Sequence, residues 1–253
     1  MPVETATTLA VVPAYNEEAT VASVVRELKE HQPRFDVLVV DDGSTDATRR
    51  VAEGAGARVL PLPFNLGIGG AVQAGFAYAR EHDYAYMVQV DGDGQHDPRQ
   101  IDLLADAMRA SSGVDMVCGS RFLDEIEYKA PFMRRFGIQI FARLLTFIVG
   151  QPVTDPTSGF RLYNRRAIDV FARDYPHDYP EVEAVLMVHF HQLRMSEVHV
   201  RMFQRGGGKS SINSGKSAYY MVKVMLAILI GLVRARPVPA PGEDAAVTAQ
   251  HSL

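Results

Sequence analysis

The sequence predicts an α/β domain with a mostly parallel sheet flanked by helices. Short apolar runs alternate with segments of helical periodicity over the first 120 residues, which is the order of right-handed βαβ units. Acidic or glycine-rich clusters follow these runs, and ligands of such sheets bind outside the carboxyl ends of the strands. A chain of 253 residues that is 47% hydrophobic and 22% charged suits one large domain.

The first half of the chain contains the expected βαβ elements in order. Strands are expected over residues 8–13, 37–40, 58–62, 86–90 and 115–119. Helices are expected over about 21–28, 47–53, 71–78 and 98–110, where apolar residues recur at helical spacing. The continuous apolar run at 37–40 is typical of a strand that is covered on both faces.

The pattern changes after residue 130. An apolar-rich helix is expected over 133–149, a loop over 151–161, a helix or buried run from 179 to 189, and a strand over 198–203. A second apolar helix over 219–233 has about 15 residues, fewer than the roughly 20 that span a bilayer. Because both apolar helices carry Arg or Lys at their margins, we expect them to lie in a membrane interface. The alternative is that they pack on the sheet or form a dimer contact.

The net charge of −4 is unevenly distributed. Residues 1–193 hold 18 basic and 27 acidic side chains, whereas residues 194–236 hold eight basic side chains and one acidic one. A basic end on an acidic body indicates an anionic partner such as a membrane surface or a phosphate. No nucleic-acid recognition motif accompanies this charge, so we expect no nucleic-acid partner.

The sequence also indicates a reducing, cytoplasmic location. Residues 1–7 lack the basic start and apolar core of a secretory signal. The single cysteine, Cys118, lies in an apolar run, which favours a buried, inert thiol over a nucleophile.

An acidic turn is the strongest single signal of chemistry. Asp91, Gly92, Asp93, Gly94 and Gln95 follow the apolar run 86–90. Gly92 and Gly94 permit a sharp turn, and carboxylate oxygens are hard ligands that suit Mg²⁺ or Mn²⁺. The alternative is an Asp/Gly surface turn before a helix that opens at Pro98.

Four motifs together resemble the family 2 glycosyltransferases, over about residues 8–235. They are V-P-A-Y-N-E-E at 12–18, V-D-D-G-S-T-D at 40–46, N-L-G-I-G-G-A at 65–71 and D-G-D at 91–93. Within that family, residues 93–96, 155–161 and the basic glycine loop 205–211 resemble the dolichyl/polyprenyl-phosphate sugar transferases. The resemblance implies a GT-A (Rossmann-like) fold, an inverting mechanism, Mg²⁺ or Mn²⁺, and a UDP- or GDP-hexose donor.

The resemblance also implies a division of the chain. We expect a flexible N-terminus at 1–7 and a GT-A domain at 8–217, with a nucleotide-sugar half (8–120) and an acceptor half (121–217). An apolar interfacial helix at 218–236 and a disordered tail at 237–253 follow.

The family's site residues carry over to matching positions. The residues expected to bind the nucleotide sugar are Pro13, Tyr15, Glu17, Asp41, Asp42, Gly67 and Asp91. The expected metal ligands are Asp91, Asp93 and Gln95. The cations expected at the acceptor phosphate are Arg121, Arg161, Arg205 and Lys209. The residues expected to be catalytic are Asp93, Arg161 and Glu183.

Two kinds of acceptor remain open. A sugar hydroxyl must lose a proton and needs a carboxylate base, for which Glu181 and Glu183 are candidates, although both also suit an ordinary helix N-terminus. A polyprenyl monophosphate is already mostly dianionic and needs cations to place it. The resemblance favours hexose transfer to a polyprenyl phosphate by a peripheral protein at the inner membrane face, with a small membrane partner or a homodimer as the expected assembly. The alternative is a transferase of cell-wall or polysaccharide synthesis.

Other classes of protein fit less well. A nicotinamide oxidoreductase would carry G-x-G-x-x-G after the first strand, where this chain has Ala14, Tyr15, Asn16 and Glu17. A sugar-nucleotide pyrophosphorylase would carry a basic glycine-rich loop there. A non-catalytic nucleotide-binding protein would have no need to keep Asp91, Asp93 and Gln95 together.

Overall fold

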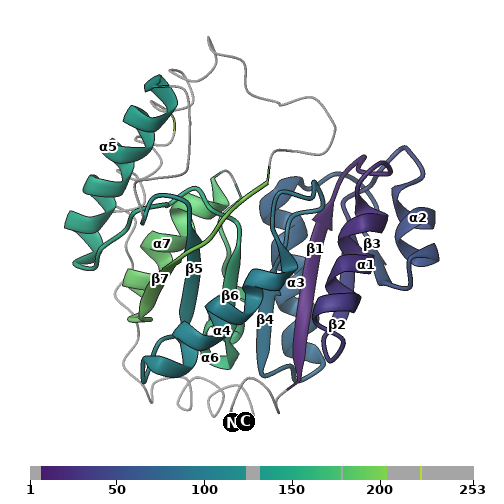
Figure 1. Cartoon of the computed structure of the whole chain (residues 1–253), viewed down its shortest axis with the longest axis horizontal. Coiled ribbons are helices and arrows are strands. Elements are labelled where there is room, and N and C mark those ends of the chain that lie inside the picture. Colours follow the sequence, from purple (N-terminus) through teal and green to yellow (C-terminus); the bar gives the residue numbers. More distant parts are fainter. Residues whose placement is uncertain (1–6, 124–131, 178, 204–222, 224–253) are drawn as a thin grey trace, which may run out of the picture.

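The computed structural model describes residues 7–123, 132–177, 179–203 and 223, and it consists of a sheet between two layers of helices (Figure 1). The strands are β1 (Thr8–Ala14), β2 (Asp36–Asp41), β3 (Arg58–Pro61), β4 (Tyr86–Gln89), β5 (Met116–Ser120), β6 (Arg161–Asn164) and β7 (Met195–His199). The helices are α1 (Val21–His31), α2 (Thr48–Gly54), α3 (Gly67–Glu81), η1 (Pro98–Gln100), α4 (Ile101–Ala110), α5 (Phe132–Val149), α6 (Arg165–Phe171) and α7 (Pro180–Phe190).

The described strands form one seven-stranded sheet in the order β3-β2-β1-β4-β6-β5-β7. Strands β1 to β4 are parallel, β6 runs antiparallel to both of its neighbours, and β7 is parallel to β5. In the centre, Val11 of β1 lies opposite Leu38 of β2 and Gln89 of β4. The predicted α/β fold with a mostly parallel sheet is confirmed.

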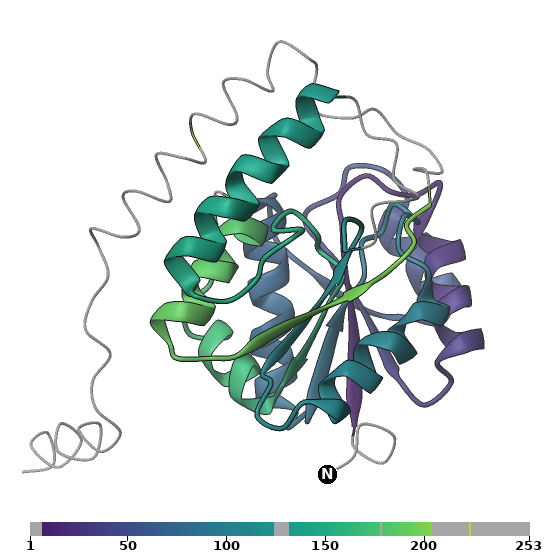
Figure 2. The same ribbon diagram turned by 60° about the vertical axis from the view of Figure 1, so that its left-hand side comes forward.

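Alternation along the strands divides the apolar residues between two cores. In β1, Leu9 and Val11 face α3, α6 and α7, whereas Ala10 and Val12 face α1 and α4. Helix α5 joins the first of these layers by packing on α7 (Figure 2). Full burial of a Val or Leu side chain stabilises the folded state by about 1.5–3 kcal/mol. Helices therefore cover both faces of the sheet, and the ends of its strands remain accessible for a binding site.

The structure corrects two parts of the sequence prediction. Residues 151–161 were expected to form a loop, but the chain re-enters the sheet at Arg161 as β6, and α6 follows. The charged side chain of Arg161 and the short length of β6 hide this strand from a pattern of apolar residues. The strand expected at 198–203 lies earlier in the chain: β7 covers Met195–His199 and ends where its pairing with β5 ends, at Ser120.

Several expectations concern residues outside the described part of the chain. They are the N-terminus at 1–6, the tail at 237–253 and the apolar helix at 218–236, of which only Lys223 is described. Among the described helices, including α5, none is both long and apolar enough to cross a membrane.

Candidate active site

Three loops meet at the carboxyl ends of β1, β2 and β4, which form the upper edge of the sheet in Figure 1. We call residues 15–20, 42–47 and 91–97 the motif loops. The first two are joined by Asn16, whose amide donates to Ser44 Oγ (3.0 Å) and whose Oδ1 accepts from the Thr45 amide (2.8 Å). The Glu17 amide donates to Thr48 Oγ1 at 2.8 Å. The first two sequence motifs therefore form one connected unit.

Five of the residues expected to bind the nucleotide sugar lie in or next to the first two motif loops. Pro13 is buried in β1, Tyr15 is 46% exposed, and Glu17 is half-buried. Asp41 and Asp42 are both buried at the end of β2. Tyr15 thus presents the largest accessible surface of the five.

Asp42 also fixes the start of α3. Its Oδ1 accepts a hydrogen bond from the Leu66 amide at 2.7 Å, and Gly67 begins the helix with a φ of +79°. Burial raises the pKa of the Asp42 carboxyl, an effect that the Leu66 hydrogen bond opposes. The third motif is consequently attached to the first two through a carboxylate from β2.

The acidic turn after β4 is held by its neighbours. Gly94 has a φ of +77°, as a tight turn requires, and the Gln95 amide donates to Asp93 Oδ1 at 3.0 Å. Thr20, at the start of α1, donates from its hydroxyl to the Gly92 carbonyl at 2.8 Å. The acidic turn is thereby tied to the first motif loop, a contact that the sequence analysis did not foresee.

The donor set of this turn fits a divalent cation. The Asp91 side chain is 35% exposed, and Asp93, although only 8% exposed, lies in the same turn with the half-buried Gln95. A Cβ at Gly159 would lie 3.1 Å from both carboxylate oxygens of Asp91, so glycine there leaves room beside them. Within the described residues, no three His, Cys, Asp or Glu side chains form a cluster that could hold a metal. The set suits an ion such as Mg²⁺ that takes few protein carboxylates and completes its shell with substrate phosphates and water.

A second group of charged residues lies beside the motif loops, and we call Arg121, Asp155, Arg161 and Glu197 the buried charge network. Asp155 is fully buried and pairs with Arg121 Nε (2.7 Å) and Nη2 (2.8 Å). Glu197 of β7 accepts from the amides of Thr154 (2.8 Å) and Asp155 (3.2 Å). The charge of Arg121, expected to contact a phosphate, is thus paired inside the protein.

Arg161 lies deeper than its predicted role requires. It is 1% exposed, and its Nη2 donates to the carbonyls of Glu181 (2.7 Å) and Pro156 (3.3 Å). Its Nε and Nη1 have no hydrogen-bond partner among the described residues. The guanidinium therefore lies beneath the 155–160 loop and the start of α7, in the interior of the protein.

The two candidate bases at the start of α7 have different surroundings. Glu183 Oε1 accepts from the Tyr179 amide at 3.2 Å and so helps to close the helix N-terminus. The pKa of Glu181 is raised, mainly by burial and further by the nearby charge of Asp91. The structure brings Glu181 toward the acidic turn, which spacing alone did not distinguish. Arg205 and Lys209 lie outside the described residues.

Cys118 is buried in β5, as predicted. Burial raises the pKa of its thiol to about 12, which keeps it protonated at neutral pH. The expectation of an inert cysteine is therefore consistent with its surroundings.

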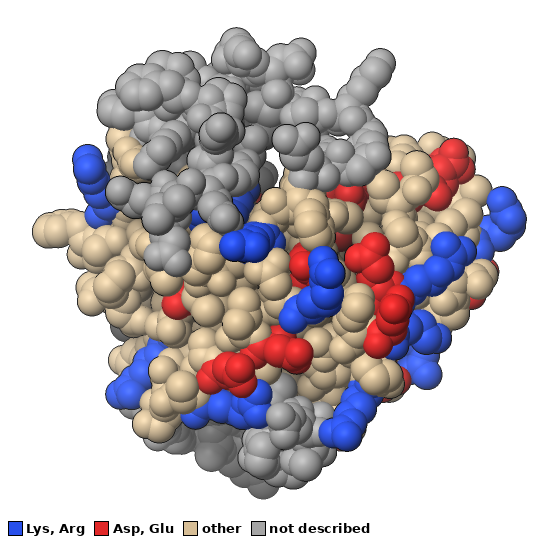
Figure 3. Space-filling model, in the orientation of Figure 1, with Lys and Arg blue, Asp and Glu red and all other residues tan. Residues whose placement is uncertain are grey.

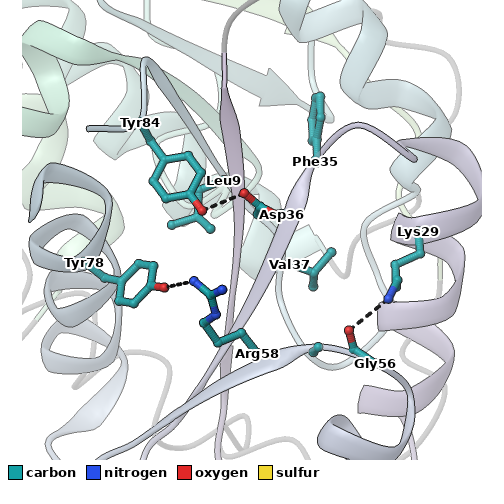
Figure 4. Close-up of a pocket in the computed structure, with 10 residues that line it drawn as sticks. Leu9, Lys29, Phe35, Asp36, Val37, Gly56, Arg58, Tyr78 and Tyr84 are labelled. Carbon is teal, nitrogen blue, oxygen red and sulfur yellow. Dashed lines mark hydrogen bonds between the residues drawn. The ribbon is translucent and has the colours of Figure 1, made fainter. Parts of the chain in front are cut away.

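A separate hollow of about 420 Å³ lies at the opposite edge of the sheet, near the amino ends of β1, β2 and β3 (Figure 4). Its polar groups bind one another: the Tyr84 hydroxyl donates to Asp36 (2.7 Å), Lys29 donates to the Gly56 carbonyl (2.9 Å), and Arg58 donates to Tyr78. The functional groups of the four motifs are thus at the other end of the strands.

On the face shown in Figure 3, acidic and basic side chains are interspersed and do not gather into one patch. Of the basic end predicted at 194–236, only Arg194, Arg201 and Lys223 are described, and all three are exposed.

Comparison with known proteins identifies the family. Residues 9–171 match the family model described as glycosyl transferase family 2. The undecaprenyl-phosphate mannosyltransferase of Micrococcus luteus is 32% identical over 216 residues, which cover 82% of this chain and 88% of that protein. The polyprenol monophosphomannose synthase of Mycolicibacterium smegmatis is 31% identical over 169 residues, or 64% of this chain and 63% of that protein.

A solved structure supports the fold. The glucosyl-3-phosphoglycerate synthase of Mycobacterium tuberculosis, in complex with Mn²⁺, UDP-glucose and phosphoglyceric acid, superposes with a TM-score of 0.67 at 22% identity. The match covers 94% of this chain and 83% of that one. The family resemblance seen in the sequence is confirmed: the chain belongs to glycosyl transferase family 2 and is a glycosyltransferase with the GT-A fold.

Proposed function

We propose that this enzyme transfers a hexose, with inversion, from a nucleoside-diphosphate sugar to a polyprenyl monophosphate at the cytoplasmic face of a membrane. The observation that carries the proposal is the acidic turn, which is joined to the first two motif loops at the carboxyl ends of parallel strands. The Thr20–Gly92 hydrogen bond of 2.8 Å makes this junction. Ligands of α/β sheets bind at this edge.

In this proposal the motif loops bind the donor. Pro13, Tyr15 and Glu17 contact the base and ribose, with Asp41, Asp42 and Gly67 beside them. Asp91, Asp93 and Gln95 hold the cation and the diphosphate. A bound Mg²⁺ or Mn²⁺ would stabilise the charge that develops on the leaving diphosphate. Mn²⁺ is the ion in the synthase of similar fold, so it is the first to test.

The acceptor is assigned from the relatives and from charge. By their names, one relative is a mannosyltransferase of undecaprenyl phosphate and the other synthesises polyprenol monophosphomannose. A lipid monophosphate is mostly dianionic near neutral pH and needs cations more than a base. Arg161 supplies a buried positive charge beneath the 155–160 loop, and we assign Arg121, Arg205 and Lys209 to the same acceptor side.

One observation favours the alternative acceptor, a sugar hydroxyl. Glu181 lies near Asp91, and its pKa is raised, mainly by burial, which makes its carboxylate a stronger base than an ordinary one. In that case the enzyme would extend a polysaccharide, and Glu181 would take the hydroxyl proton.

The membrane role is proposed from exposed apolar side chains on α5. Phe147 is 87% exposed and Ile140 is 38% exposed, and Arg143 between them is also exposed. An apolar hollow of about 450 Å³ beside them is lined by Phe122 and Val153, among others. Aromatic and aliphatic side chains with adjacent cations suit the headgroup boundary of a membrane.

The deciding experiment supplies purified protein with UDP- and GDP-hexoses, Mg²⁺ or Mn²⁺, and either undecaprenyl phosphate or a free oligosaccharide. We expect a lipid-linked monosaccharide with inverted anomeric configuration. Glu181→Gln and Glu183→Gln should then keep most of the activity. Transfer only to the oligosaccharide, with a rate that falls as pH drops below the raised pKa of Glu181 and is lost in Glu181→Gln, would establish the alternative.

A further inference from the structure

His96 lies against the acidic turn with only 3% of its side chain exposed. The backbone amide of Asp91 donates to His96 Nδ1 at 3.0 Å, which closes the turn from 91 to 96. Because Nδ1 accepts this bond, the ring proton of the neutral imidazole is on Nε2. Nε2 lies 3.6 Å from Asp91 Oδ2, a polar contact that is longer than a hydrogen bond. One imidazole ring therefore contacts both the amide and the carboxylate of the same aspartate.

The ring also connects the turn to the neighbouring loop. It stacks on Phe160, with ring centroids 4.8 Å apart and planes 23° from parallel. Phe160 is fully buried and follows Gly159, the residue whose Cβ would approach both Asp91 oxygens to 3.1 Å. The Asp91 carboxylate thus lies between the backbone at Gly159 and the edge of the imidazole.

The backbone around His96 is also bonded to the segment that follows β7. His96 forms an antiparallel bridge with Met202, and the Phe203 amide donates to the Gln95 carbonyl at 2.9 Å. Gln100 exchanges two hydrogen bonds of 2.7 Å with the backbone of Arg201. These bonds hold the backbone at residues 95–100 against the backbone at residues 201–203.

We infer that His96 is a positioning residue that orients the Asp91 carboxylate for the cation and the donor diphosphate. The inference rests on the proposed function of the acidic turn. Metal-binding residues are generally oriented by hydrogen bonds from the residues around them, and loss of such a bond costs about 10–100-fold in metal affinity or activity. Here the bond runs from the Asp91 amide to His96 Nδ1 and fixes the backbone that carries the carboxylate.

Two substitutions separate positioning from packing. His96→Phe keeps the ring that stacks on Phe160 and removes both nitrogens. His96→Asn removes the ring but places an amide oxygen where Nδ1 accepts the Asp91 amide. If His96 positions Asp91, Mn²⁺-dependent binding of UDP or GDP should fall about 10–100-fold in His96→Phe and much less in His96→Asn. Thermal stability should rank the variants in the opposite order, because the Phe variant keeps the apolar contact.

Two measurements without nucleotide check the geometry. A long-range ¹H–¹⁵N spectrum of the wild-type chain should show the Nε2–H tautomer of His96. The Asp91 amide should exchange slowly in the wild type and in His96→Asn, and rapidly in His96→Phe.

A wild-type ring protonated on Nδ1 alone, or nucleotide binding that follows thermal stability, would overturn the His96 inference while the proposed function stands. If the wild-type chain binds neither UDP nor GDP with Mn²⁺, the proposed function fails and the His96 inference fails with it.

Discussion

The motif loops and the buried charge network differ in what their polar side chains hold. In the motif loops, side chains such as Asn16 and Asp42 bind backbone amides of neighbouring loops. In the buried charge network, Arg121 and Asp155 bind each other at 2.7 Å, and Arg161 lies wholly inside. The first arrangement fixes the backbone of the loops that carry the proposed site. The second keeps charge beneath the surface, where removing one partner of an ion pair is costly.

This comparison predicts that substitutions in the motif loops affect activity first, and that breaking the Arg121–Asp155 pair of the network affects stability first. The largest expected effect on activity is at Asp93. Asp93→Ala should abolish transfer, because it removes a proposed ligand of an ion whose charge stabilisation is worth several kcal/mol. It should also weaken Mn²⁺-dependent nucleotide binding while the circular dichroism spectrum stays that of the wild type.

The matched control is Asp106→Asn on the exposed surface of α4, which should transfer at the wild-type rate. Excess chelator should likewise abolish transfer by the wild-type enzyme. It should not change the transfer rate of Asp93→Ala, which is already lost. Wild-type rates in chelator would show that the acidic turn does not act through a metal.

The next effect is on stability and tests the Arg121–Asp155 pair. Arg121→Met leaves the fully buried carboxylate of Asp155 without its cation, which should lower the free energy of unfolding by about 3–5 kcal/mol. The control is Arg165→Met, which breaks pairs at the surface and should cost about 1 kcal/mol or less. Urea denaturation measures both. If Arg121→Met loses transfer without losing stability, the proposed role of Arg121 at the acceptor outweighs its pairing with Asp155, and the contrast between the two regions is wrong.

The same contrast explains what could be predicted from the sequence. Each motif is contiguous, and the rule that parallel strands place their carboxyl ends at one edge was enough to predict that Asp42 and Asp91 lie at the same edge of the sheet. The pairs of the network join residues far apart in the chain: Arg121 with Asp155, and Glu197 with Thr154. No local pattern marks such pairs, so Arg121 and Arg161 were assigned to the substrate without any sign of how deeply they lie. For the same reason β6, which carries Arg161 into the sheet, was missed.

A smaller effect is expected at Arg161, where the two regions meet. Arg161→Met keeps much of the volume and removes a buried charge that has two N–H groups without partners among the described residues. Stability should change little, since apolar replacements of buried charges are often neutral. Transfer to undecaprenyl phosphate should fall about tenfold, the equivalent of about 1.4 kcal/mol in the barrier. Arg161→Lys, which keeps the charge, should retain more activity; equal loss in both variants would mean that the guanidinium fork, rather than the charge, is required.

The smallest expected effect concerns α5 and would extend the comparison to the membrane. Phe147 of α5 and Leu103 of α4 are both exposed apolar residues, at 87% and 42%. If α5 lies in the headgroup boundary, Phe147→Ser should weaken co-sedimentation with anionic vesicles by about tenfold, since burial of an aromatic side chain is worth about 1.5–3 kcal/mol. Leu103→Ser should leave vesicle binding unchanged, because α4 lies on the opposite face of the sheet. High salt should weaken binding of both variants and of the wild type, as far as cations contribute to it. Equal binding by the wild type and both variants would remove α5 from the membrane contact without touching the assignment of the motif loops.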